Sequence, residues 1–136
     1  MPLPPLQHWT WQGEEGIFAV GYRQQPSEGT SAPVLLVHGF GASSDHWRAN
    51  VAPLAQQQPV WALDLLGFGS SDKPRSRLAD EPQAPGSVRY CFDLWAQQVA
   101  DFASQVIQPE QRMQLVGNSI GGIVTLRAAQ LLSQRG

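Results

Sequence analysis

The sequence predicts a single α/β domain with a mostly parallel sheet, an antiparallel hairpin at its amino-terminal end, and helices on both faces. Three short, continuous apolar runs at 34–37, 60–63 and 113–116 are typical of strands that are covered on both faces. Segments of helical period follow each run, and this alternation favours parallel pairing with right-handed crossovers. The 136 residues, 42% of them apolar, are enough for one core.

The first elements are a hairpin, a strand and a helix. Two β-prone runs, 9–12 and 17–23, flank the turn sequence Gly13-Glu14-Glu15-Gly16 and predict the hairpin. The apolar strand 34–37 follows. A helix is then expected from His46 to about Gln57, with Asp45 as its cap.

The second half of the chain is predicted as loop, helix, strand and helix. The segment 65–89 holds several glycines and prolines and is expected to be a long loop with solvated basic side chains. An apolar stripe at helical spacing predicts a helix over 90–107. A final helix is expected over 123–134. The apolar stripe of the helix 90–107 consists of Trp95, Val99, Phe102 and Val106.

Composition excludes several classes of function. A net charge of −2 lacks the basic stripe of a nucleic-acid binder, and no apolar run approaches the length of a membrane span. One cysteine and three histidines without metal-ligand spacing give no reason to expect a metal or another cofactor. The proline-rich start shows no secretory signal, so the expected location is a reducing compartment, the cytoplasm.

One motif carries chemistry. Gly117-Asn118-Ser119-Ile120-Gly121 fits the pattern G-x-S-x-G between a strand and a helix, the setting of a nucleophile elbow. Such a turn strains the serine backbone and leaves no room for side chains at 117 and 121, hence glycine at both positions. Ser119 would then project into a cleft as a nucleophile. The alternative is a tight turn with an incidental serine.

A second loop is expected beside this turn. His38 and Gly39 end the strand 34–37, and the carboxyl ends of parallel strands meet at one rim of a sheet. The backbone N–H groups of Phe40 and Ile120 would then converge on an oxyanion that develops next to Ser119.

Together these motifs resemble the amino-terminal half of an α/β-hydrolase. The similarity covers residues 34 to about 132, in the order and spacing of that family. The residues of these motifs are also similar to those of pheophytinase-like hydrolases of cyanobacteria and plastids. The resemblance implies a serine nucleophile at 119, backbone oxyanion donors at 40 and 120, and supporting roles for His38, Gly39 and Asp64. The matching segments are Leu35–Ser44, Trp47-Arg48, Asp64–Pro74, Tyr90–Ala96 and Leu115–Gly122.

The family's acid and histidine are expected after the serine, but the 17 residues that follow Ser119 hold no His, Asp or Glu. We therefore expect residues 1–136 to be a partial domain, truncated after the elbow helix and inactive by itself. The strand 113–116 would then have an unpaired apolar edge through which the chain self-associates.

The predicted function is that of a serine hydrolase acting on an apolar, ester-like small molecule. Three alternatives remain at this stage. The chain is a non-catalytic binding or regulatory remnant, a perhydrolase or haloperoxidase-like enzyme, or a hydrolase of carbon–carbon bonds, since Asn118 before the serine also occurs in relatives of that last kind.

Overall fold

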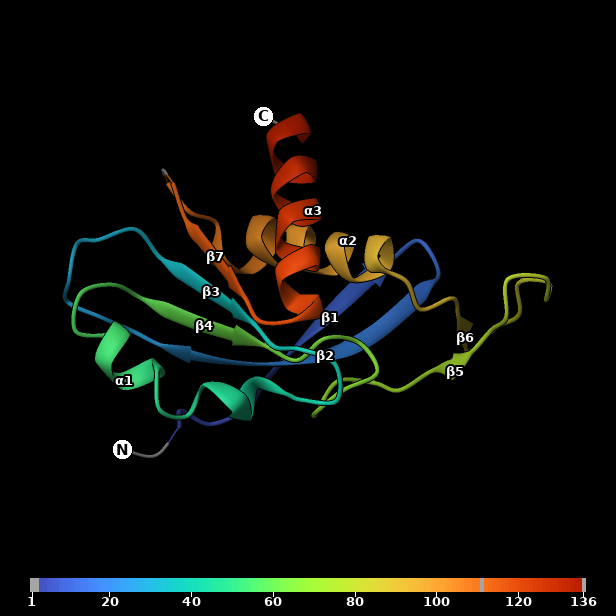
Figure 1. Ribbon diagram of the computed structural model, residues 1–136, viewed down its shortest axis with the longest axis horizontal. Coiled ribbons are helices and arrows are strands. Elements are labelled where there is room, and N and C mark those ends of the chain that lie inside the picture. Colours follow the sequence, from blue (N-terminus) through green and yellow to red (C-terminus); the bar gives the residue numbers. More distant parts are fainter. Residues whose placement is uncertain (1–2, 111, 136) are drawn as a thin grey trace.

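The computed structural model describes residues 3–110 and 112–135. A five-stranded sheet forms its centre, in the order β1-β2-β4-β3-β7 (Figure 1). Strands β3, β4 and β7 are parallel, and β2 is antiparallel to both β1 and β4. The strands are β1 (Gln7–Gly13), β2 (Gly16–Gln25), β3 (Val34–Val37), β4 (Val60–Leu63) and β7 (Gln114–Gly117). The predicted hairpin and parallel strands are confirmed.

Helices cover both faces of the sheet, as predicted. The short α1 (Val51–Leu54) lies on one face, and α2 (Phe92–Phe102) and α3 (Ile120–Arg135) lie on the other (Figure 1). All residues of β3 and β4 are buried because alternate side chains pack against opposite layers. One core joins Leu35 and Leu63 to the α2–α3 layer, and a smaller core joins their sequence neighbours to α1.

The helix predicted over 46–57 is wrong. The chain instead forms a 3-10 turn, η1 (Ser44–Trp47), followed by the separate α1. A continuous helix would place Pro53 in its interior, without the N–H that the carbonyl of Ala49 requires. Starting at Val51 puts Pro53 in the first turn, where a missing N–H costs nothing. Ser43, not Asp45, caps η1, and its side chain accepts from the Asp45 N–H.

The predicted stripe on the next helix is confirmed. Trp95, Val99 and Phe102 are buried in the main core, and Val106 packs against it. The regular helix α2 ends at Phe102 and continues as a π-helical stretch, η2 (Ala103–Ile107). Gln108 then adopts a left-handed conformation with φ of 50° and ends the element.

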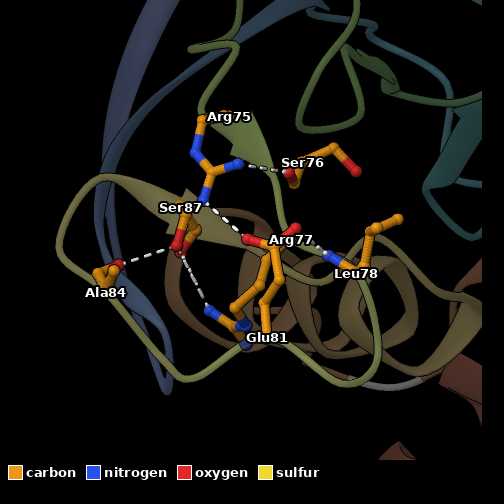
Figure 2. Close-up of polar contacts among 7 residues, drawn as sticks. All are labelled: Arg75, Ser76, Arg77, Leu78, Glu81, Ala84 and Ser87. Carbon is orange, nitrogen blue, oxygen red and sulfur yellow. Dashed lines mark hydrogen bonds and ion pairs between the residues drawn. The ribbon is translucent and has the colours of Figure 1, made fainter.

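The long loop 65–89 is more structured than expected. It contains two short parallel strands, β5 (Arg75–Ser76) and β6 (Ser87–Val88). Figure 2 shows polar contacts within this excursion, residues 65–89. The Arg77 guanidinium donates to the Ser87 carbonyl, and Ser87 Oγ donates to the Ala84 carbonyl over 2.8 Å. The expectation of a solvated Arg77 is wrong. Its side chain is 9% exposed and pairs with Glu15 in the β1–β2 turn.

Candidate active site

Sheet register brings the two predicted loops to one rim. Val37 at the end of β3 pairs with Leu63 on one side and with Gly117 on the other. The next residues, His38, Asp64 and Asn118, therefore leave the sheet side by side, and the Asn118 N–H donates to the Val37 carbonyl over 3.2 Å. The prediction that both loops share one rim is confirmed.

The turn at Ser119 has the geometry of a strained elbow. Ser119 has a φ of 60°, in the left-handed region that a serine rarely adopts. A β-carbon on Gly117 would lie 2.1 Å from the Gly121 carbonyl oxygen, and one on Gly121 would lie 2.3 Å from the Val37 carbonyl oxygen. Both positions therefore require glycine, as the sequence pattern predicted.

Ser119 is exposed, and its hydroxyl makes no hydrogen bond to any residue that the structure describes. It lies against the loop after β3, since a β-carbon on Gly39 would be 3.6 Å from Ser119 Oγ. Helix α3 begins at Ile120, directly after the serine. Within 3–110 and 112–135, neither the Phe40 nor the Ile120 N–H donates to a protein acceptor. Both amides are therefore free to bind another oxygen.

His38 is fixed between two backbone groups. It is fully buried, its Nε2 accepts from the Leu65 N–H over 3.0 Å, and its Nδ1 donates to the Gly39 carbonyl over 2.8 Å. Burial lowers the pKa of His38, although the hydrogen bond to Gly39 opposes that effect. The neutral ring has no free nitrogen with which to take a proton from Ser119. It ties the loop after β3 to the loop after β4.

Asp64 holds the same two loops together. Its buried carboxylate accepts from the Ser44 N–H over 2.6 Å, and from the N–H and hydroxyl of Ser70 over 3.0 and 2.8 Å. A β-carbon on Gly69 would lie 2.5 Å from the Asp64 carboxyl carbon, so the loop can close only on glycine. These contacts suit the supporting role that the resemblance implied for Asp64.

Gln98 is a supporting residue that sequence reasoning missed. Its fully buried side chain on α2 donates to the Asp64 carbonyl over 3.1 Å and accepts from the Leu66 N–H over 2.9 Å. It thereby satisfies the backbone where the chain leaves β4. A usable signal existed, because Gln98 lies three residues after Trp95 and so shares the face of the apolar stripe.

The part of the chain that the structure describes offers Ser119 no hydrogen-bonded His, Asp or Glu. His46 is exposed beside Trp47, and His8 lies on β1 at 3.3 Å from the Ser70 carbonyl oxygen. No group of three His, Cys, Asp or Glu side chains among these residues is arranged to hold a metal ion. Among the described helices, none has the length and apolar character needed to cross a membrane.

Comparison with known proteins places this geometry in a family. A family model described as "alpha/beta hydrolase fold" matches residues 32–135. An uncharacterised protein of Mycobacterium tuberculosis is 34% identical over 131 residues, which cover 96% of this chain and 32% of the relative. The chloroplastic pheophytinase of Arabidopsis thaliana is 32% identical over 140 residues, covering 88% of this chain and 28% of the relative.

A solved structure agrees with these sequence matches. The crystal structure of a bacterial membrane phospholipase A superposes with a TM-score of 0.71 at 32% identity, covering 95% of this chain and 36% of that one. The chain thus spans between a fifth and a third of the length of the curated relatives it matches.

Proposed function

The chain belongs to the α/β-hydrolase fold family, and on that premise we propose that it supplies the nucleophile and oxyanion site of a serine hydrolase acting on an ester-type carbonyl. The observation that carries the proposal is the conformation of Ser119. It is exposed with a φ of 60°, between Gly117 and Gly121, where any β-carbon would clash with backbone atoms. Backbone strain of this kind persists where function requires it.

The chemistry follows from the surroundings of Ser119. Its Oγ attacks the substrate carbonyl carbon, and the carbonyl oxygen becomes an oxyanion. The N–H groups of Phe40 and Ile120 would donate to that oxyanion, and the amino-terminal end of α3 adds a favourable field. The leaving group departs as the alcohol, taking up the proton that the Ser119 hydroxyl gives up, and an acyl group remains on Ser119. Water then releases the acid and restores the hydroxyl. No metal or organic cofactor takes part in this proposal.

The proposed reaction lacks one component in this chain. A serine hydroxyl needs a base near neutral pH, and the base needs an orienting acid. Both nitrogens of His38 already bind backbone groups, so His38 does not serve as that base. We therefore expect residues 1–136 alone to exceed the uncatalysed rate by no more than about 10³–10⁴-fold, the level that binding and an oxyanion hole sustain without a complete triad.

A chromogenic ester tests the proposal. With p-nitrophenyl acetate in excess, we expect slow acylation of Ser119, detected as an acetyl adduct on the intact chain by mass spectrometry. Ser119→Ala should abolish the adduct, whereas the matched variant Ser133→Ala, which removes another exposed serine, should retain it. Rapid ester turnover that Ser119→Ala leaves unchanged would refute the assignment. Ligand binding without any acylation would instead favour a non-catalytic binding function.

A further inference from the structure

An apolar pocket of about 220 Å³ is lined in part by Phe40, whose N–H is one of the two proposed oxyanion donors. Its walls come from the loop after β3, the loop after β4 and the start of α2. The pocket is lined by Phe40, Gly67, Phe68, Tyr90 and Trp95. Four of its five lining residues are therefore aromatic.

The aromatic rings are arranged around the pocket as a connected set. The Phe68 ring lies between two others in this set. Its centroid is 5.5 Å from that of Phe40 and 5.9 Å from that of Trp95. Tyr90 continues the set, 6.0 Å from Trp95. Phe40 is 75% exposed, so most of its side chain is open to a ligand.

The polar atoms of these rings are already satisfied within the protein. Tyr90 Oη donates to the Pro74 carbonyl over 2.6 Å, and Trp95 Nε1 donates to the Leu66 carbonyl over 2.9 Å. A ligand therefore meets ring faces and edges, with no free side-chain hydrogen-bond group among the lining residues. Burying a charged or polar group here would cost its hydration without replacement. The pocket selects for an uncharged apolar group.

The shape of the pocket depends on Gly67. Its φ of 93° is left-handed, and a β-carbon there would lie 2.9 Å from the Tyr90 ring. Any other residue would press on Tyr90 and close the space. An apolar cavity of about 150 Å³ already holds benzene, so this pocket accommodates one substituted six-membered ring.

The loop after β3 connects the pocket to the nucleophile, because Gly39 lies against Ser119 and the next residue, Phe40, lines the pocket. Ser119 Oγ is 3.6 Å from the position of a β-carbon on Gly39, and Phe40 follows directly. We propose that this pocket binds a single uncharged aromatic ring of the substrate and so holds its carbonyl next to Ser119. The ring pocket itself stands on the geometry of the four aromatic residues, but its role in positioning a carbonyl rests on the proposed function.

Binding of toluene to the whole chain tests the pocket without requiring catalysis. In a titration followed by NMR, we expect saturable shifts of the Trp95 indole N–H, with nuclear Overhauser effects from toluene to the Trp95 and Phe40 rings. Methylcyclohexane, which has a similar size but no π face, should bind at least five-fold more weakly. Absence of saturable shifts, equal affinity for methylcyclohexane, or contacts located elsewhere would each overturn the proposal.

Two matched substitutions sharpen the test. Phe68→Leu removes the central ring and should weaken toluene binding at least five-fold. Phe92→Leu is the matched control. The Phe92 ring centroid lies 6.5 Å from that of Trp95, but Phe92 does not line the pocket. This substitution should therefore leave the affinity for toluene unchanged. An unchanged affinity in a folded Phe68→Leu variant would contradict the proposal, and the contacts seen in the unmodified chain decide the matter if that variant fails to fold.

Ser119→Ala separates this inference from the proposed function. The variant should bind toluene as the parent chain does, because the ring pocket does not include Ser119. Binding retained in both chains, together with no acylation of Ser119, would refute the hydrolase proposal and leave the ring pocket standing. Acylation of Ser119 without toluene binding would refute the ring pocket and leave the hydrolase proposal standing.

Discussion

The main chains of Gly117 and Gly121 lie so close that a β-carbon on Gly117 would be 2.1 Å from the Gly121 carbonyl oxygen. The strand β7 and the helix α3 meet at this point, with Ser119 between them. The close approach turns the chain sharply enough to expose the serine and to aim the first amides of α3 at the rim. The elbow therefore depends on the absence of two side chains.

Gly117→Ala should destabilise the fold because the new methyl group meets backbone, which cannot move aside as a flexible side chain can. We expect the free energy of unfolding to fall by about 3 kcal/mol, as for a severe case of overpacking. Urea denaturation measures this decrease.

Gly122→Ala is the matched control. Its β-carbon would lie 3.7 Å from the nearest atom, an ordinary contact, and alanine in a helix should add about 0.5–1 kcal/mol. Equal effects of the two substitutions would contradict this account.

The buried ring of His38 predicts a pH dependence of stability. Burial holds the pKa of His38 below its ordinary value of 6.5 in the folded chain. As pH falls through about 6.5, the unfolded chain takes up a proton that the folded chain does not, so the free energy of unfolding decreases. The decrease has a limiting slope of about 1.4 kcal/mol per pH unit and ends below the folded-state pKa.

Urea denaturation at several pH values between about 8 and 5 measures this slope. His38→Gln removes the titrating group, so stability of that variant should depend less steeply on pH over the same range. The same slope in both chains would show that His38 is not the group responsible.

The Arg77–Glu15 ion pair should contribute to stability, because it joins the excursion 65–89 to the β1–β2 turn and is largely shielded from water. Glu15 also accepts from the Arg89 N–H over 2.8 Å. Arg77→Met should lower the free energy of unfolding by about 1–3 kcal/mol, in line with loss of hydrogen bonds to a charged group.

Arg75→Met is the control for that substitution. In the same excursion Arg75 pairs with Glu81 (Figure 2). The pair has a separation of 3.0 Å, and the Arg75 side chain is 61% exposed. Exposed pairs contribute little, so we expect little or no change in the free energy of unfolding measured by thermal or urea denaturation. A larger loss from Arg75→Met than from Arg77→Met would contradict the ranking by burial.

The edge of β7 predicts self-association. In the described part of the chain β7 pairs only with β3, and Val116 on β7 is 40% exposed. Unpaired apolar edges pair with other strands, so the apparent mass in analytical ultracentrifugation should rise with concentration. Val116→Lys should suppress that rise. Leu78→Lys adds the same charge at another exposed apolar side chain and should not. A concentration-independent mass would refute the prediction.

The parts of the fold that the sequence predicts well are those fixed by local pattern. Strands β3 and β4 begin and end where predicted, since burial on both faces leaves an unbroken apolar run bounded by polar or turn residues. The elbow was equally predictable, because backbone strain at Ser119 demands glycine two residues away on each side. The position of the loops after β3 and β7 at one rim of the sheet followed from the parallel pairing of these strands alone.

The missed features depend on long-range contacts. Gln98 bonds to Leu66, 32 residues away, and Arg77 bonds to Glu15, 62 residues away. Helical spacing from Trp95 indicates that Gln98 faces the core, but no local pattern indicates which distant group a buried polar side chain will bond. The broken helix after β3 had a local signal in Pro53, which a prediction based on apolar spacing overlooked.

Selective modification of Ser119 tests the central claim most directly. We would treat the chain with a fluorophosphonate and map the adduct by peptide mass spectrometry, using the exposed Ser104 and Ser133 as internal references. The account predicts slow modification that is concentrated at Ser119, absent from Ser119→Ala, and accompanied by shifts of the Phe40 and Ile120 amide resonances. Modification spread evenly over the exposed serines, or none at Ser119, would contradict it.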